Sequence, residues 1–189
     1  KKILCVLLLL LTGCSSKTSM IEIQKHVYVE KEFKDSWLET NEFGDSYIKE
    51  ELQGGYHYHF DQQFLEIFFN TGGKIELYNY SIKKNDLIIS GEMIPPKTIR
   101  LVHPHLDNVT SEGVIIHELG HYFDEKHQFS SSKQFTKLYK KYRTLFNQKT
   151  KKEYFAECFK EYVGGHQEKV KPFHSYMKTI TQKIRQKNK

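Results

Sequence analysis

The sequence contains no apolar run long enough to cross a membrane as a helix. The longest such run, from Ile3 to Leu11, is far below the ~20 residues that a spanning helix needs. The chain also has no internal repeat and no recognised nucleic-acid-binding motif. The formal net charge of +6 therefore does not by itself indicate binding to DNA or RNA, and we expect no nucleic-acid partner.

The N-terminus is typical of an export signal. Lys1 and Lys2 form a positive segment before the apolar run, and Leu11-Thr12-Gly13-Cys14 follows it. This tetrapeptide resembles the lipobox of bacterial lipoproteins, which implies removal of residues 1–13 and lipidation of Cys14, with residues 14–20 as a polar tether. We expect the protein at the outer face of the bacterial cell membrane, held there by lipid, with a secreted fraction. An ordinary secretory signal is the alternative.

Cysteine is scarce, with three residues in 189. If Cys5 leaves with the signal and Cys14 carries lipid, Cys158 is the one remaining thiol, and a disulfide within the mature chain is excluded. The mature chain would have 189 − 13 = 176 residues. That length suits a single domain at 21–189 that buries its core without covalent cross-links, and we expect a monomer.

Basic residues gather near the C-terminus. Removal of Lys1 and Lys2 would lower the net charge from +6 to +4 (6 − 2), and much of the excess lies in the tail. These tail residues are Lys178, Lys183, Arg185, Lys187 and Lys189. Such a tail could help adsorb the protein to an anionic cell surface, and a solvated helix face is the alternative.

The spacing of apolar residues predicts strands in the first part of the chain and helices in the second. Alternation predicts strands at 21–29, 74–80, 87–89 and 98–102, with a turn at Pro95-Pro96. Helical spacing is weak at 30–52 and clear at 61–70, 133–146, 153–163 and 172–184. A further helix is predicted to begin after the capping residues 108–112 and to end near His127. Strands followed by helices predict an α+β fold.

One of the predicted helices contains a metal-binding pattern, His117-Glu118-Leu119-Gly120-His121. Residues four apart lie on one face of a helix, so His117 and His121 can direct two imidazoles at one ion. Glu118 is offset around the helix, where its carboxylate can reach a water molecule without binding the metal. This arrangement suits peptide hydrolysis, in which Glu118 takes a proton from water and passes it to the leaving amine.

A catalytic zinc needs a third protein ligand and an open position. The segment Glu153-Tyr154-Phe155-Ala156-Glu157 again places two acids four residues apart. Acids beside so many apolar residues are costly to bury unless a cation compensates them, whereas a solvated acidic stripe is the alternative. We assign Glu153 as the ligand and Glu157 as the acceptor of a hydrogen bond from a ligand imidazole, although spacing alone leaves this order open.

Both segments resemble a known family. Residues 111–121, Ser-Glu-Gly-Val-Ile-Ile-His-Glu-Leu-Gly-His, with Asp124 after them, are similar to the active-site helix of the zinc metallopeptidases that include the anthrax lethal factor catalytic domain and the Pro-Pro endopeptidases. Residues 153–157 resemble that family's Glu-Phe-Phe-Ala-Glu segment, whose first glutamate binds zinc. The resemblance implies a zincin-like (gluzincin) fold with its catalytic core at about 60–184, one Zn²⁺ per chain, and Glu153 as the third ligand.

The chain departs from the family at one position. Seven residues before the ligand glutamate the family places a tyrosine whose hydroxyl stabilises the oxyanion, and here that position is Phe146. Tyr142 could substitute from a shifted register. Removing one oxyanion donor typically costs about 10²–10³ in rate.

The sequence therefore predicts a zinc-dependent endopeptidase that cleaves extracellular or cell-surface proteins. We expect an extended peptide substrate that pairs with an edge strand at 98–102. One alternative is a non-catalytic binding lipoprotein of the same fold. The other is an extracytoplasmic metal-binding protein that uses the histidine pairs His57/His59 and His103/His105. The substrate, including any Pro-Pro preference, is not determined by the sequence.

Overall fold

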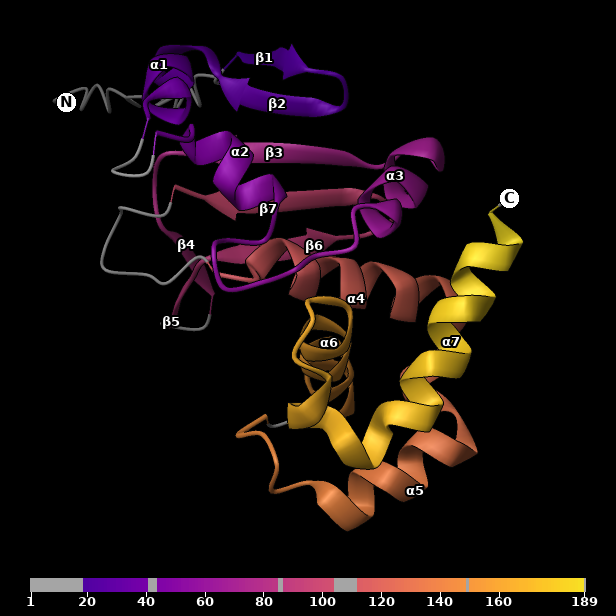
Figure 1. Cartoon of the computed structure of the whole chain (residues 1–189). Coiled ribbons are helices and arrows are strands. Elements are labelled where there is room, and N and C mark those ends of the chain that lie inside the picture. The colour runs from indigo at the N-terminus through magenta and orange to yellow at the C-terminus, as the bar shows by residue number, and fades with distance from the viewer. Residues whose placement is uncertain (1–18, 41–43, 85–86, 104–111, 149, 189) are drawn as a thin grey trace, which may run out of the picture.

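The computed structural model describes residues 19–40, 44–84, 87–103, 112–148 and 150–188. It has the predicted α+β architecture, a mixed five-stranded sheet followed by a helical C-terminal half (Figure 1). The predicted lipidation site Cys14 and the capping residues 108–111 lie outside the described residues. Within the described ranges, the helices are all too short or too polar to cross a membrane.

The five-stranded sheet has the order β1-β2-β3-β7-β6. Strands β2, β3 and β7 are parallel to one another, while β1 and β6 run antiparallel to their neighbours at the two edges. Strands β4 and β5 pair antiparallel in a separate two-stranded sheet. The strands are β1 (Met20–Gln24), β2 (Val27–Glu30), β3 (Lys74–Tyr78), β4 (Ile82–Lys84), β5 (Leu87–Ile89), β6 (Gly91–Ile94) and β7 (Thr98–Val102).

The edge strand differs from the prediction. We expected residues 98–102 at the edge, but β7 lies inside the sheet because β6 pairs with it on the far side. The two strands form a hairpin around Pro95-Pro96, where the sequence predicts a turn. The 21–29 strand prediction is also too simple, since β1 and β2 form an antiparallel hairpin that turns at His26, whose φ is 68°.

Helix α4 (Val114–His127) packs against β6 and β7 and also contacts α2 (Tyr47–Leu52) and α3 (Gln63–Asn70). Helix α6 (Lys151–Val163) packs on α4 on the side away from the sheet (Figure 1). The two helices approach each other closely at Gly120, where an added Cβ would lie 2.9 Å from the Cα of Ala156. The glycine between the two histidines therefore brings the two helices together.

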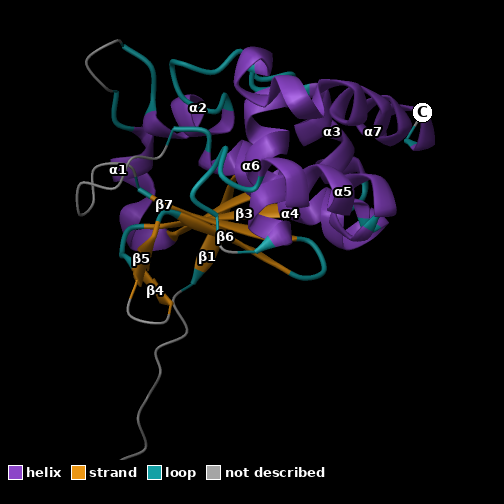
Figure 2. Ribbon diagram, turned by 90° about the horizontal axis from the view of Figure 1, so that it is seen from below, coloured by secondary structure: helices purple, strands orange, loops and turns teal. Residues whose placement is uncertain are grey.

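The remaining helices extend the layer of α6. Helix α5 (Lys133–Tyr142) and helix α7 (His174–Lys187) pack around α6, and α7 also contacts α3 (Figures 1 and 2). An aromatic cluster that includes Phe135, Tyr154, Phe155 and Phe173 fills the space between them. Short segments complete the chain: α1 (Lys34–Leu38) and the 3₁₀ helices Lys31–Phe33, Phe129–Ser131 and Gln167–Phe173, the last of which contains Pro172.

Candidate metal centre

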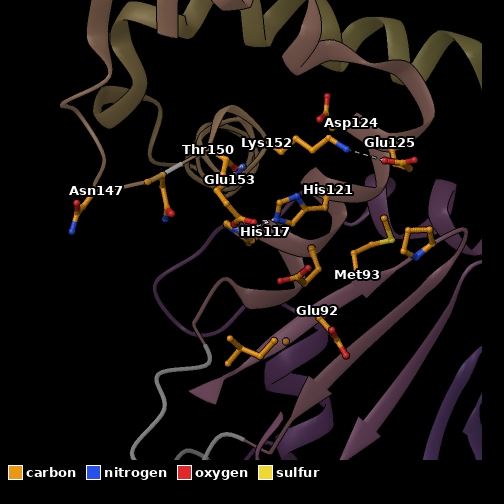
Figure 3. A pocket seen from close by; sticks show the side chains of 15 residues that line it. Glu92, Met93, His117, His121, Asp124, Glu125, Asn147, Thr150, Lys152 and Glu153 are labelled. Atoms are coloured by element: carbon orange, nitrogen blue, oxygen red, sulfur yellow. Dashed lines mark hydrogen bonds and ion pairs between the residues drawn. The ribbon is translucent and has the colours of Figure 1, made fainter. Parts of the chain in front are cut away.

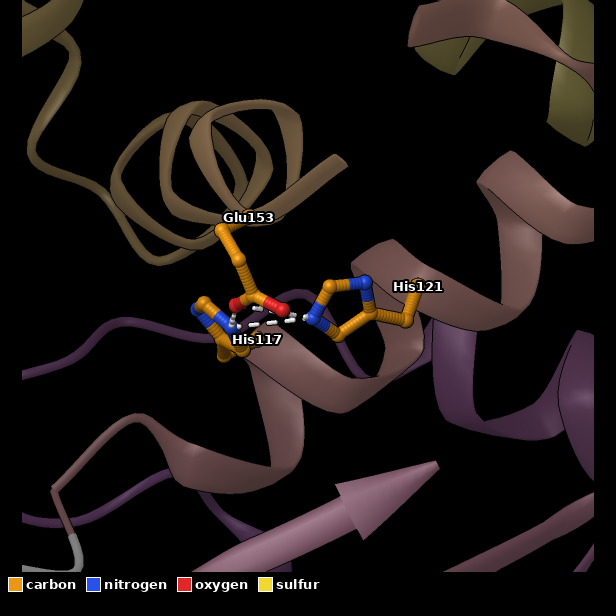
Figure 4. A group of neighbouring side chains, drawn as sticks. All are labelled: His117, His121 and Glu153. Atoms are coloured by element: carbon orange, nitrogen blue, oxygen red, sulfur yellow. Dashed lines mark hydrogen bonds and ion pairs between the residues drawn. The ribbon is translucent and has the colours of Figure 1, made fainter. Parts of the chain in front are cut away.

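Two helices supply the three residues of the candidate centre. His117 and His121 lie one turn apart on α4, and Glu153 lies in the first turn of α6 (Figure 4). Thr150 caps α6, because its hydroxyl accepts a hydrogen bond from the Glu153 N–H at 3.2 Å. The cap fixes the beginning of the helix and therefore the position from which Glu153 reaches the imidazoles.

The three side chains converge on one point. His117 Nε2 lies 3.2 Å from His121 Nε2, and Glu153 Oε2 lies 3.2 Å and 3.3 Å from these two nitrogens. Zinc bonds of about 2.0–2.1 Å at tetrahedral angles place neighbouring ligand atoms about 3.3–3.4 Å apart. The triangle therefore has the size that a tetrahedral zinc site requires, and among the described residues this is the one group of three or more His, Cys, Asp or Glu that could hold a metal.

The other nitrogen of His117 has its own carboxylate partner. Nδ1 lies 3.2 Å from Glu157 Oε2, and the other Glu157 oxygen accepts from the Lys160 ammonium at 2.6 Å. A carboxylate on Nδ1 favours the tautomer that leaves Nε2 available to a metal. The sequence predicts Glu157 beside a ligand imidazole, but it gives no signal for Lys160 beyond the spacing of three residues.

Glu118 lies beside the candidate centre without belonging to it. Its side chain is buried, with 6% of the residue exposed, and it accepts a hydrogen bond from the backbone N–H of Met93 on β6. Burial raises the pKa of its carboxyl above the ordinary value, and the nearby imidazoles of His117 and His121 oppose this effect. A carboxylate with a raised pKa is a better proton acceptor.

The ligand residues strongly polarise one another. Hydrogen bonds from His117 and His121 hold the pKa of Glu153 far below its usual range. Burial would lower the pKa of His117, but its hydrogen bonds with Glu153 and Glu157 outweigh burial and raise the pKa to about 9. The donor set of one ionised carboxylate and two imidazoles suits Zn²⁺, although Zn²⁺ bound there would have to displace the proton that the raised pKa of His117 keeps on its ring.

A cavity of about 760 Å³ opens onto the centre (Figure 3). Edge strand β6 forms one wall through Gly91, Glu92 and Met93, and the segment before α6 forms another through Asn147 and Gln148. On the remaining side Lys152 pairs with Glu125 at 3.3 Å. The cavity is large enough for several residues of an extended peptide.

The two aromatic residues considered for the oxyanion lie elsewhere. The Tyr142 ring packs against Phe173, with 6.0 Å between ring centroids, and Phe146 packs against Tyr154 at 5.3 Å. Neither residue lines the cavity. Asn147 and Gln148 reach it instead, which sequence reasoning missed because they belong to no motif.

The additional histidine pairs do not form a metal group with other described residues. His57 pairs with Glu112 at 2.5 Å, while the neighbouring Tyr58 donates a hydrogen bond to Glu161 at 3.1 Å. His103 is buried between aromatic rings, with its ring centroid 4.8 Å from those of Trp37 and Tyr47. The other histidine of this pair, His105, lies outside the described residues.

The arrangement of His117, His121 and Glu153 resembles the metal site of zincins, in which a His-Glu-x-x-His helix is completed by a glutamate from a second helix. No protein-family model and no curated protein matches the chain. The assignment of the candidate metal centre therefore rests on the positions of His117, His121 and Glu153.

Proposed function

We propose that the chain is a zinc-dependent endopeptidase with a zincin-like fold of the glutamate-completed type. One observation carries this proposal, namely the triangle of ligand atoms with sides of 3.2–3.3 Å beside the buried carboxylate of Glu118. A purely structural metal site has no use for a buried proton acceptor next to its ligands. The family resemblance of residues 111–124 and 153–157 points the same way.

His117, His121 and Glu153 would hold the metal, and the cavity leaves the fourth direction open to solvent and substrate. Zn²⁺ in this position supplies Lewis-acid chemistry, since it lowers the pKa of water and polarises a carbonyl group. Glu118 takes a proton from the attacking water and delivers it to the leaving nitrogen. Glu157 keeps His117 in the tautomer that binds metal, and Lys160 holds Glu157 in place.

Edge strand β6 would bind the substrate backbone. Ser90 C=O accepts from the Val102 N–H, and in an antiparallel ladder alternate residues then bond to β7. The backbone groups of Gly91 and Met93 therefore point away from β7, and while the Met93 N–H donates to Glu118, the Met93 carbonyl and both groups of Gly91 point where a peptide could pair. An extended peptide can add to this edge as a further strand, which corrects the strand predicted for this role from β7 to β6.

Activity on a mixture of diverse peptides tests the proposal. We expect cleavage by the zinc-loaded protein, no cleavage in the presence of a zinc chelator, and recovery when zinc is added back. Glu118→Ala should abolish cleavage while the zinc content stays near one per chain. Full activity of Glu118→Ala would overturn the assigned chemistry, because no other described carboxylate in the cavity is buried beside both imidazoles.

A second candidate is a metal-dependent peptide-binding protein without catalysis. The cavity wall favours it in one respect, since no described residue that lines the cavity is a tyrosine able to donate to an oxyanion. Peptides that bind to the zinc-loaded protein and are recovered intact after long incubation would support this candidate over the peptidase.

We further propose that the protein is anchored by lipid on Cys14 at the outer face of the cell membrane. The apolar run and the following Leu11-Thr12-Gly13-Cys14 support this proposal. Expression in a bacterium with a radiolabelled fatty acid should label the wild type and not Cys14→Ala. Equal labelling of both proteins would contradict the proposal.

A further inference from the structure

A second cavity continues the metal cavity past the end of β6. It has a volume of about 330 Å³ and shares Pro95 and Glu125 with the metal cavity. Its other walls come from the β6–β7 turn, from the residue after α3 and from the outer part of α4. A peptide bound along β6 would therefore enter this second cavity, which we call the turn cavity, without leaving the protein surface.

The floor of the turn cavity is apolar and held in place. Tyr122, which is 4% exposed, contributes its ring, and its hydroxyl lies 2.6 Å from the hydroxyl of Thr71. Thr71 in turn donates to the Phe68 carbonyl at 2.8 Å. Pro95 and Pro96 add two rigid rings to the wall. An apolar side chain placed here loses its contact with water.

The rim of the turn cavity is positively charged. The ammonium of Lys97 donates to the Thr71 carbonyl at 2.5 Å, and the ammonium of Lys126 lies 5.9 Å from the Tyr122 ring centroid. Both lysines line the cavity. The one acid on its wall, Glu125, is paired with Lys152. A carboxylate beside the apolar group of a ligand would therefore meet two cations there.

Strand geometry gives the distance from the scissile bond. Met93 contacts Glu118, and Pro95 and Pro96 follow it by two and three residues. At about 3.3 Å per residue, a paired peptide reaches the turn cavity two or three residues from the bond that is cut. Antiparallel pairing, the more stable arrangement, places these residues on the N-terminal side of that bond.

We propose that the turn cavity is a specificity site for the substrate, taking an apolar side chain two or three residues before the scissile bond together with an acidic side chain two positions away, on the same face of the extended peptide. The inference rests on the proposed peptidase function and names the substrate class that function would prefer. It assigns specificity to Lys97, Lys126 and Tyr122, all of which lie outside the metal centre.

Quenched-fluorescent peptides built on one cleaved core sequence test the proposal. The peptides vary at the second to fourth positions before the scissile bond, with Phe or Ser in combination with Glu or Lys. We expect the wild type to give the highest kcat/KM with Phe and Glu two positions apart. The double variant Lys97→Glu/Lys126→Glu should lower the ratio of kcat/KM for Glu over Lys peptides about tenfold or reverse it, while keeping the preference for Phe over Ser.

The matched control is Lys137→Glu/Lys140→Glu, which makes the same charge change at exposed positions of α5. This control should keep the wild-type ratio of kcat/KM for Glu over Lys peptides. An equal fall of this ratio in both double variants would indicate a general effect of protein charge and would overturn the proposed specificity site. The same ratio in the wild type and Lys97→Glu/Lys126→Glu would also overturn it. If the double variant fails to fold, the single variant Lys126→Glu is used instead and should also lower the ratio of kcat/KM for Glu over Lys peptides. Absence of any cleavage by the wild type would instead refute the peptidase function itself.

Discussion

Replacement of Gly120 by alanine tests whether the close approach of α4 and α6 builds the metal centre. The new Cβ would lie 2.9 Å from Ala156 Cα, 3.2 Å from Ala156 O and 3.2 Å from Phe159 Cβ. Carbon atoms in ordinary contact are about 3.5–4.0 Å apart, so α6 must retreat from α4 by roughly 0.6–1 Å. The nearest atom belongs to the α6 backbone and cannot be relieved by a side-chain rotation.

This retreat should weaken zinc binding more than it weakens the fold. Alanine favours the helix by about 1 kcal/mol over glycine, and overpacking costs about 1–3 kcal/mol, so the net loss of stability is about 0–2 kcal/mol. Glu153 lies one turn before Ala156 and moves with it, whereas metal–ligand distances tolerate only about 0.2 Å. We expect the zinc dissociation constant to rise by at least about tenfold, comparable with the loss of a group that orients a ligand.

Competition with a chromophoric chelator measures the zinc affinity, and urea unfolding of the metal-free protein measures stability. Gly73→Ala is the matched control, because its Cβ would lie 2.6 Å from the Phe68 ring. That variant should lose stability and keep its zinc affinity. Wild-type zinc affinity in Gly120→Ala, or an equal loss of zinc affinity in both variants, would show that the contact of Gly120 with α6 does not position the zinc ligand.

Three further predictions concern the site and the core. Purified Glu153→Ala should contain no zinc, while Glu157→Ala should retain zinc with an affinity about 10–100-fold lower than that of the wild type. Metal analysis of both variants measures this, and the reverse order would exchange the roles of the two glutamates. Burial would raise the pKa of Glu76, but hydrogen bonds from Lys74, Tyr78 and Arg100 outweigh it and lower the pKa below its ordinary value. Its ionised form therefore stabilises the fold at pH values above the ordinary carboxyl pKa, and this contribution is lost as the pH falls through the lowered pKa. In urea unfolding, Glu76→Gln should lower the free energy of unfolding by about 1–2 kcal/mol at pH 7 and by much less near pH 3. Burial also raises the pKa of the Cys158 thiol far above its usual range, so it should resist a thiol reagent at pH 8 until the protein is unfolded, and rapid labelling of the native protein would contradict this burial.

The helices of the site were predictable because their signals are local. The four-residue spacing of His117 with His121, and of Glu153 with Glu157, depends only on helical geometry, and both segments are helical. The α+β fold followed from the order of strand and helix patterns, and the structure confirms it. The distance between the two helices was not predictable in this way, since it depends on the tertiary contact of Gly120 with Ala156.

The sheet edge was predicted wrongly for a physical reason. Gly-Glu-Met-Ile of β6 has no clear alternation, and its strand forms because the Pro95-Pro96 turn returns the chain along β7. Gly91 also lets this strand approach α4, since an added Cβ would lie 2.6 Å from Val114 Cγ1. Pairing between segments and packing against a helix, rather than local propensity, decided this element.

Anomalous diffraction at the zinc absorption edge, from crystals of the zinc-loaded protein, tests whether His117, His121 and Glu153 bind zinc. We expect one strong peak per chain, about 2.0–2.2 Å from His117 Nε2, His121 Nε2 and a carboxylate oxygen of Glu153. A peak bound by Glu157 in place of Glu153, a peak at another group, or no peak at this site would contradict this expectation.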